Sequence, residues 1–322
     1  MTKKLFILCM AFVWAATMTA QNIAVVSPEG ETSLYKTLQE ATKGAEPESV
    51  IYLPGGIFEG NDTITKKLTI IGVGSKPISG NSDGSTYLSG DIFFSVGSDG
   101  SAVMGCRCNQ LRIGYRTIAA VNDFLLMYNH IERLYICSKS GTIINQNFIN
   151  TLFGFSGISA SGDSYLTVKN NIIVTIEYTL DSVVSNNIIV GGTYNIANGC
   201  TNIVFTNNIF MKNSILSSSC KNCILSGNMA MTDTSEDCIN IGSVDWNDVF
   251  VKYDRSNLWN CDFHFKDEYN QYQNQVGIYA GDGFNDKQMA PVPYIVSKHI
   301  DEQTDAQGKL NIRVRVKAGD TE

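Results

Sequence analysis

A short asparagine-centred motif recurs along the middle of this chain about every twenty residues. Its clearest copies are KNNI at 169–172, SNNI at 185–188, TNNI at 206–209 and SGNM at 226–229, and weaker copies are CNQL at 108–111, YNHI at 128–131 and NQNF at 145–148. The third position of each copy, taken as the marker, is Gln110, His130, Asn147, Asn171, Asn187, Asn208 and Asn228. A regular period of this length indicates a protein built from stacked repeats.

The residues around the marker have the character of short β-strands. The residue after it is always apolar, and the residue three before it is apolar in every copy except the first, which has Arg107. Asparagine tolerates the left-handed backbone that a sharp bend between strands requires. One coil cannot bury its own apolar face, so each strand must pair with its equivalent in the next coil. We therefore predict an all-β fold, a right-handed single-stranded parallel β-helix (solenoid).

The N-terminal part has the features of a cover for one end of such a solenoid. A strand at 23–26 is followed by a segment at 33–42 with Leu34, Leu38 and Ala41 on one face, which predicts a short amphipathic capping helix with that face buried. The segments VIYLPGGIFE at 50–59 and KLTIIGVG at 67–74 come next. This order resembles the opening of the pectin lyase-like superfamily, especially the first coils of pectin methylesterases. The resemblance covers 23–74 in motif and 75–244 in architecture, and it implies the fold more than an activity.

The composition changes after the last repeat. Residues 246–290 are rich in aromatic side chains, which predicts a C-terminal cap packed on the last coil, with a sugar-stacking surface as the alternative. Segments 294–300 and 310–316 read as the two strands of a closing β-hairpin. The predicted organisation is a signal peptide at 1–20, a β-helix at 21–245, a cap at 246–290 and a hairpin at 291–322.

The first twenty residues have the three parts of an export signal. Lys3 and Lys4 precede a short apolar run at 5–16, and Ala20 marks a cleavage position. No later stretch is apolar enough to cross a bilayer, so we predict a secreted protein (extracellular, cell-surface or periplasmic) that is not an integral membrane protein. A net charge of −7 with 17% charged residues argues against a nucleic-acid partner.

Eight cysteines follow the signal segment. Cys200 and Cys220 are one repeat apart and are predicted to lie one above the other, as free thiols or as a disulfide. The pairs Cys106/Cys108 and Cys220/Cys223 lack the further ligands that a zinc site needs. No metal and no cofactor is predicted.

The residues that perform catalysis in the resembled enzymes are not matched. The Gly-x-x-Asp-Phe-Ile-Phe-Gly motif of pectin methylesterases, the polygalacturonase motifs and the acid cluster of pectate lyases are all missing from the sequence. His130 is interpreted as a turn residue at the marker position rather than as an acid or base. Arg112 and Glu132 each follow a marker by two residues and are expected to form a surface ion pair.

Five residues are candidates for ligand binding. Glu177, Tyr194 and Asn195 are expected beside the groove of the first-strand sheet, and Trp246 and Trp259 lie in the aromatic segment. The catalytic residues stay unassigned. The favoured function is a non-catalytic exported protein that binds polysaccharide or a cell-surface partner. The alternatives are a polysaccharide lyase or pectinesterase-like enzyme with an unrecognised site, and a structural or adhesive surface protein.

Overall fold

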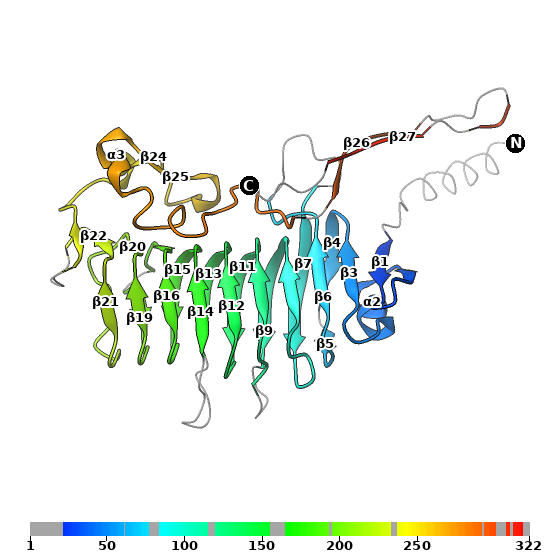
Figure 1. Cartoon of the computed structure of the whole chain (residues 1–322), viewed down its shortest axis with the longest axis horizontal. Helices are drawn as coiled ribbons and strands as arrows, with labels where there is room; N and C mark the ends of the chain where they lie inside the picture. Colours follow the sequence, from blue (N-terminus) through cyan, green and yellow to red (C-terminus); the bar gives the residue numbers. More distant parts are fainter. Residues whose placement is uncertain are drawn as a thin grey trace, which may run out of the picture.

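The chain folds into a parallel β-solenoid whose coils stack along one long axis (Figure 1). The computed structural model describes residues 22–60, 62–76, 84–114, 120–154, 165–192, 195–232, 237–291, 293–300, 307–309 and 312–317. The predicted signal segment therefore lies outside the described residues. Consecutive coils contribute parallel strands in matched register to two long sheets, which confirms the β-helix expected from the repeat.

The first sheet, sheet A, runs in the order β2 (Thr32–Tyr35), β1 (Ile23–Val26), β3 (Val50–Leu53), β6 (Thr69–Gly72), β8 (Ala102–Met104), β10 (Leu125–Met127), β12 (Thr142–Asn145), β14 (Leu166–Lys169), β16 (Val183–Ser185), β19 (Val204–Thr206) and β21 (Ile224–Ser226). Sheet B runs in the order β4 (Gly56–Glu59), β7 (Thr86–Phe94), β9 (Cys106–Ile113), β11 (His130–Ile136), β13 (Phe148–Phe153), β15 (Ile172–Glu177), β17 (Ile188–Ile189), β20 (Ile209–Phe210), β22 (Met229–Ala230) and β23 (Ile239–Asn240). Two short strands pair at its side, β5 (Asp62–Ile64) with β7 and β18 (Ala197–Asn198) with β15.

A continuous ladder of buried asparagines marks the corner between the two sheets. Its members are Asn129, Asn147, Asn171, Asn187, Asn208 and Asn228, all with no exposed surface. In each step the backbone N–H and the side-chain amide of one asparagine donate to the side-chain oxygen of the next, as Asn171 does to Asn187 at 2.8 and 3.0 Å. The amide also donates to backbone carbonyls, so the polar groups of this interior corner are satisfied.

Cysteines lie at both ends of the ladder. The backbone N–H of Cys106 donates to the side-chain oxygen of Asn129, and the thiol of Cys238 contacts the carbonyl of Asn228. The pairing register places Cys106 and Cys238 at the positions that asparagine occupies in the coils between them.

The ladder corrects the predicted marker in the first two copies. His130 pairs with Phe148, so Asn129, and not His130, stands level with Asn147. In the copy before, Cys106 and not Gln110 occupies this position, because His130 pairs with Arg107. The left-handed backbone also falls one residue earlier than predicted, at the residue before each ladder position: Gly105, Tyr128, Gln146, Asn170, Asn186, Asn207 and Gly227. The two asparagines of an Asn-Asn pair thus have separate roles, the first in the bend and the second in the interior ladder.

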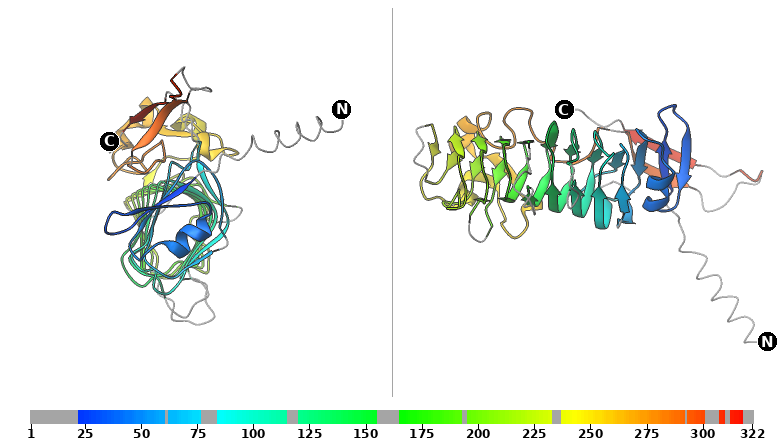
Figure 2. Two further views of the ribbon diagram at one scale, coloured as in Figure 1. Left: turned by 90° about the vertical axis from the view of Figure 1, so that its right-hand side faces the viewer. Right: turned by 90° about the horizontal axis from the view of Figure 1, so that it is seen from below.

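A short helix, α2 (Leu38–Gly44), covers the N-terminal end of the solenoid, and it crosses the opening in the end-on view (Figure 2). It begins later than the sequence pattern predicts. Thr37 and Glu40 form a capping box that fixes the start of the helix, and residues 32–35 form β2 instead. As a result Leu34, expected on the buried face, is exposed, whereas Leu38 and Ala41 are buried as predicted.

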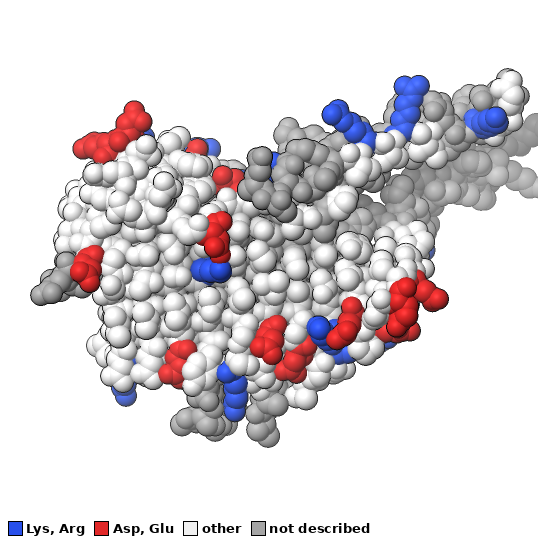
Figure 3. Space-filling model, in the orientation of Figure 1, with Lys and Arg blue, Asp and Glu red and all other residues white. Residues whose placement is uncertain are grey.

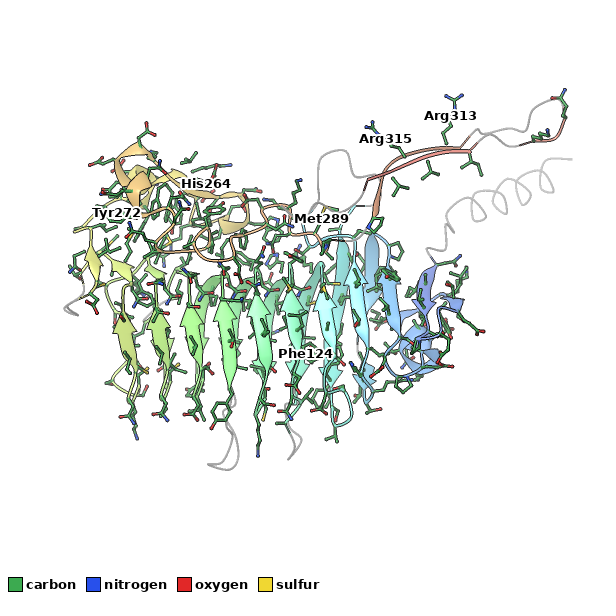
Figure 4. All side chains as sticks on the ribbon, viewed as in Figure 1. Phe124, His264, Tyr272, Met289, Arg313 and Arg315 are labelled. Carbon is green, nitrogen blue, oxygen red and sulfur yellow. The ribbon has the colours of Figure 1, made fainter. Side chains whose placement is uncertain are left out.

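Residues 246–290, here called the strap, run along the side of the solenoid from its last coils back toward its first ones (Figure 1). The strap contains α3 (Trp246–Val249), β24 (Phe250–Lys252), η1 (Leu258–Asn260), β25 (Asp262–Phe265) and η2 (Asp267–Tyr272). Its contacts follow that path: Trp246 donates to the carbonyl of Met211, and further along the strap Gln288 accepts from the backbone of Ser75. The aromatic segment therefore covers a side of the solenoid, and Figure 4 shows His264 and Met289 at separate places along it.

The bend residues hold the strap in place. The side chain of Asn170 donates to the carbonyls of Ile278 and Ala280, and the side chain of Gln146 accepts from the backbone of Asn285. These hydrogen bonds come from the bend residues, which lie next to the ladder residues in sequence. The same corner of the coil therefore forms hydrogen bonds both within the interior ladder and to the strap.

After the strap, β26 (Tyr294–Ile300) and β27 (Ile312–Lys317) form the antiparallel hairpin predicted from the sequence. Arg313 and Arg315 point away from the solenoid (Figure 4), and basic side chains lie along the outer side of the hairpin in the space-filling view (Figure 3). Ile312, Val314 and Val316 are also exposed. Among the described residues, no helix has the length and apolar character needed to span a bilayer.

Candidate functional site

Two parallel rows of side chains point outward from sheet B, and the ladder position sets both. The residue directly after each ladder position forms the first row, here called the covered row: Arg107, His130, Phe148, Ile172, Ile188, Ile209 and Met229. In the longer strands the residue six after the ladder position forms the second row, here called the open row: Arg112, Tyr135, Phe153 and Glu177, continued by Asn198. Side chains between them, such as Leu134 and Ile176, point into the core.

The apolar part of the covered row is buried under the strap. Ile188 and Met229 have no exposed surface, and the strap residues Val276 and Ile278 belong to the same cluster. Burying one such side chain stabilises a fold by ~1.5–3 kcal/mol. The five apolar members of the row together therefore contribute on the order of 10 kcal/mol to holding the strap in place.

The polar end of the covered row is closed by Trp259 of the strap. The Trp259 ring stacks on the His130 imidazole with 4.5 Å between centroids, and Phe148 meets His130 edge-on at 4.7 Å. Lys76 lies over the outer part of Trp259, 5.5 Å from the ring centroid. The His130 side chain is left with only 13% of its surface exposed.

A small charged cluster adjoins this histidine. Nε2 of His130 lies 3.5 Å from a carboxylate oxygen of Glu132, and Arg107 approaches the same oxygen at 3.6 Å. Burial, with a smaller contribution from the charge of Arg107, lowers the pKa of His130 to about 4, so the ring is neutral at pH 7. The ion pair predicted between Arg112 and Glu132 is wrong: Glu132 pairs with Arg107, and Arg112 lies in the open row.

The open row begins with a cation and two stacked rings. Arg112 donates to Asp91 at 3.1 Å, and its guanidinium lies over the Tyr135 ring, 5.3 Å from the centroid. Tyr135 and Phe153 are nearly parallel, with an interplanar angle of 5° and centroids 4.7 Å apart. Since that spacing is the distance between neighbouring strands, the rings cover one another's faces and present their edges outward.

The open row ends in groups that form hydrogen bonds. Glu177 follows Phe153 in register, and burial raises the pKa of its carboxyl. Asn198 pairs with Glu177 and accepts from the hydroxyl of Ser219 at 3.1 Å. Tyr178, next to Glu177, is 41% exposed. The row thus offers a guanidinium, two ring edges, a carboxyl and an amide across successive coils.

The structure separates the five candidates predicted from the sequence. Glu177 lies in the open row. Trp246 is buried and stacked on Phe250, and Trp259 seals the covered row, so both tryptophans pack within the protein. Asn195 is on the surface and accepts from the hydroxyl of Ser214, and Tyr194 lies outside the described residues.

Arg112, Tyr135 and Phe153 were not among those candidates. The signal that identifies them is their position six residues after the true ladder residue. With the marker placed at His130, that position falls on the buried Ile136 instead of Tyr135.

Within the described residues, no group of three or more histidine, cysteine or acidic side chains is arranged to hold a metal ion. No protein-family model matches the chain, and no match was found among curated proteins or among solved structures.

Proposed function

We propose that this protein is exported and binds a polysaccharide, without turning it over, along the open row of sheet B. The observation that carries the proposal is the outward row from Arg112 through Tyr135 and Phe153 to Glu177, whose members are all partly exposed. Its members recur at the strand spacing of ~4.8 Å, so an extended chain of repeating sugars meets regularly placed contacts. Ring edges pack against apolar sugar C–H groups, and the polar ends bind hydroxyls.

The position of the acids favours binding over hydrolysis at this row. Asp91 lies in β7 and Glu177 in β15, four strand spacings apart, which separates them by ~19 Å. Glycoside hydrolysis with a carboxyl pair requires about 5–10 Å between the two groups. Glu132, a further acid of sheet B with basic neighbours, sits beside a histidine whose ring face Trp259 occupies.

A glycan array probed with the full-length mature chain tests the proposal, followed by titration of any retained polysaccharide into three variants. Tyr135→Ala and Phe153→Ala are expected to weaken binding about two- to tenfold each, because ring packing of this kind contributes ~0.5–1.5 kcal/mol. Tyr52→Ala is the matched control, since Tyr52 is an exposed aromatic residue on sheet A, 39% accessible. Its affinity is expected to equal that of the unaltered protein.

A parallel assay follows the release of reducing or unsaturated sugar ends from the same polysaccharides. Turnover would overturn the non-catalytic part of the proposal and revive a lyase or esterase. Retention that is equally strong in all three variants would remove the open row from the binding site. Absence of any retained glycan would favour a structural or adhesive role.

A further inference from the structure

Three cysteines meet near the C-terminal end of the solenoid. Thr201 pairs with Lys221 in parallel register, and the backbone N–H of Lys221 donates to the carbonyl of Cys200 at 2.9 Å. Cys200 and Cys220 therefore occupy equivalent positions on neighbouring coils, as the repeat predicts. Both side chains belong to the core cluster, with Cys200 fully buried and Cys220 partly accessible.

The two side chains occupy stacked positions on neighbouring coils and affect each other's acidity, and the thiol of Cys223 contacts the carbonyl of Cys200. Neighbouring strands of a sheet lie ~4.8 Å apart, which falls within the 4.4–6.8 Å between α-carbons that a disulfide spans. The register thus places the α-carbons of this pair at a separation that a disulfide spans.

The pair also differs in acidity. Interaction with the Cys200 thiol is the main cause that lowers the pKa of Cys220, with hydroxyl and backbone donors adding to it. The same interaction, with burial, raises the pKa of Cys200. The accessible Cys220 is therefore the more acidic of the two thiols and the first to reach the thiolate form, which is the form that attacks disulfides.

We propose that Cys200 and Cys220 are a redox modification site that closes to a disulfide across two neighbouring coils. The oxidant is a small-molecule or protein disulfide, RS–SR, of the kind met in an oxidising compartment. The Cys220 thiolate attacks one sulfur, which forms a Cys220–S–S–R bond and releases RS⁻. The sulfur of Cys200 then displaces the second RS⁻, and its proton passes to that leaving thiolate. Two protein thiols are oxidised and one disulfide is reduced to two thiols.

The disulfide would lie near the C-terminal end of the solenoid, beside the last strands of the two sheets. β21 and β23 are the last strands of their sheets, and Ile224 in β21 is 58% exposed. Edge strands of this kind open readily and template pairing with other chains. A covalent link between the two coils beside them limits that opening and encloses a loop of about twenty residues.

The test uses the full-length mature chain, reduced and then equilibrated with oxidised glutathione, alkylated and digested with trypsin. Cleavage after Lys169, Lys212 and Lys221 separates Cys200 (peptide 170–212) from Cys220 (213–221) and from Cys223 (222–252). We expect a cross-linked 170–212/213–221 species in mass spectra. We also expect a rise in the thermal midpoint of roughly 5 °C relative to the reduced protein.

Two variants identify the partner. Cys223→Ser is expected to keep both the cross-link and the thermal shift, and Cys200→Ser to lose both. Cross-linking of 213–221 to 222–252, which carries Cys223 and Cys238, would overturn the proposal in favour of pairing between Cys220 and one of these two cysteines. Complete alkylation of Cys200 and Cys220 after oxidation would overturn it outright, and that result does not depend on whether any variant folds.

Discussion

The covered row and the open row come from the same strands of sheet B, yet the protein uses them in opposite ways. In the covered row the residue after the ladder position is aliphatic in the later coils, and the strap buries it. In the open row the residue six after the ladder position is a cation, a ring or a carboxyl, an amide continues the row, and all of these residues are partly exposed. The solenoid thus supplies two outward surfaces. The side chains of one are buried in folding, and those of the other are the ones to which we assign the proposed binding.

The ladder that fixes both rows is where the largest loss of stability is expected. Asn187→Leu keeps the approximate size of the side chain but leaves the backbone N–H of Asn171 without its acceptor. It also removes the amide that donates to the carbonyls of Val168 and Ser185 and to the side-chain oxygen of Asn208. Each buried polar group left unpaired costs about 1–3 kcal/mol, so we expect the free energy of unfolding to fall by at least about 5 kcal/mol in urea titrations.

Asn202→Gly is the matched control for the ladder. Asn202 is part of an exposed amide chain, donating to Asp181 at 2.7 Å and accepting from Asn222, and its left-handed backbone suits glycine. Its effect should stay within about 1 kcal/mol, because water replaces its partners. Equal losses in the two variants would show that burial of the ladder is not what stabilises the coil.

Placing a charge in the covered row is expected to release the strap. Ile188→Asp puts a carboxylate where the side chain has no exposed surface and packs among apolar residues, at an expected cost of about 4 kcal/mol. Hydrogen exchange should show residues 246–290 losing protection while the interior ladder keeps it. Asn198→Asp introduces the same group in the open row, and there the change should be under about 1 kcal/mol. A strap that stays protected in Ile188→Asp would contradict the assignment of this row as its anchor.

Acid is expected to weaken the contact between His130 and Trp259 of the strap gradually. The pKa of His130 is about 4 in the folded protein, below the ~6.5 of an unfolded chain, so the fold favours the neutral ring. Its contribution is complete above pH 6.5 and is lost as the pH falls from 6.5 to 4, because the unfolded chain binds the extra proton in that range. The difference corresponds to about 3 kcal/mol at most.

His130→Gln isolates this contribution. Its curve of unfolding free energy against pH should be flatter than that of the unaltered protein between pH 6.5 and 4, although its stability at pH 7 is lower because the stack on Trp259 is lost. Parallel curves for the two proteins would mean that other groups produce the acid sensitivity.

The solenoid could be predicted from the sequence because the coils need a buried asparagine at the same corner, so the residue recurs along the chain with the period of the coil. The predicted marker was wrong at His130 and Gln110 because the copies were aligned on the apolar residue that follows the marker. That residue points inward in the His130 copy (Ile131) but outward in the Asn171 copy (Ile172), so the two copies were aligned one residue out of register. That shift of one residue hid Tyr135 from the candidate site, although Glu177, in a correctly aligned coil, was found. The path of the strap depends on packing between residues a hundred positions apart, which no local pattern encodes.

The smallest expected effect separates binding from folding in the open row. Glu177→Gln keeps the shape of the side chain and its place beside Phe153, and the group is partly exposed, so the stability at pH 7 should change by less than about 0.5 kcal/mol. Affinity for a polysaccharide retained by the protein should fall about three- to tenfold, since a hydrogen bond to a charged acceptor is stronger than one to a neutral amide. Because burial raises the pKa of Glu177, the unaltered protein should approach the variant's affinity as the carboxyl becomes protonated on acidification. Calorimetric titrations at several pH values would measure both trends, and a variant that binds as tightly as the unaltered protein at neutral pH would show that the open row ends at Phe153.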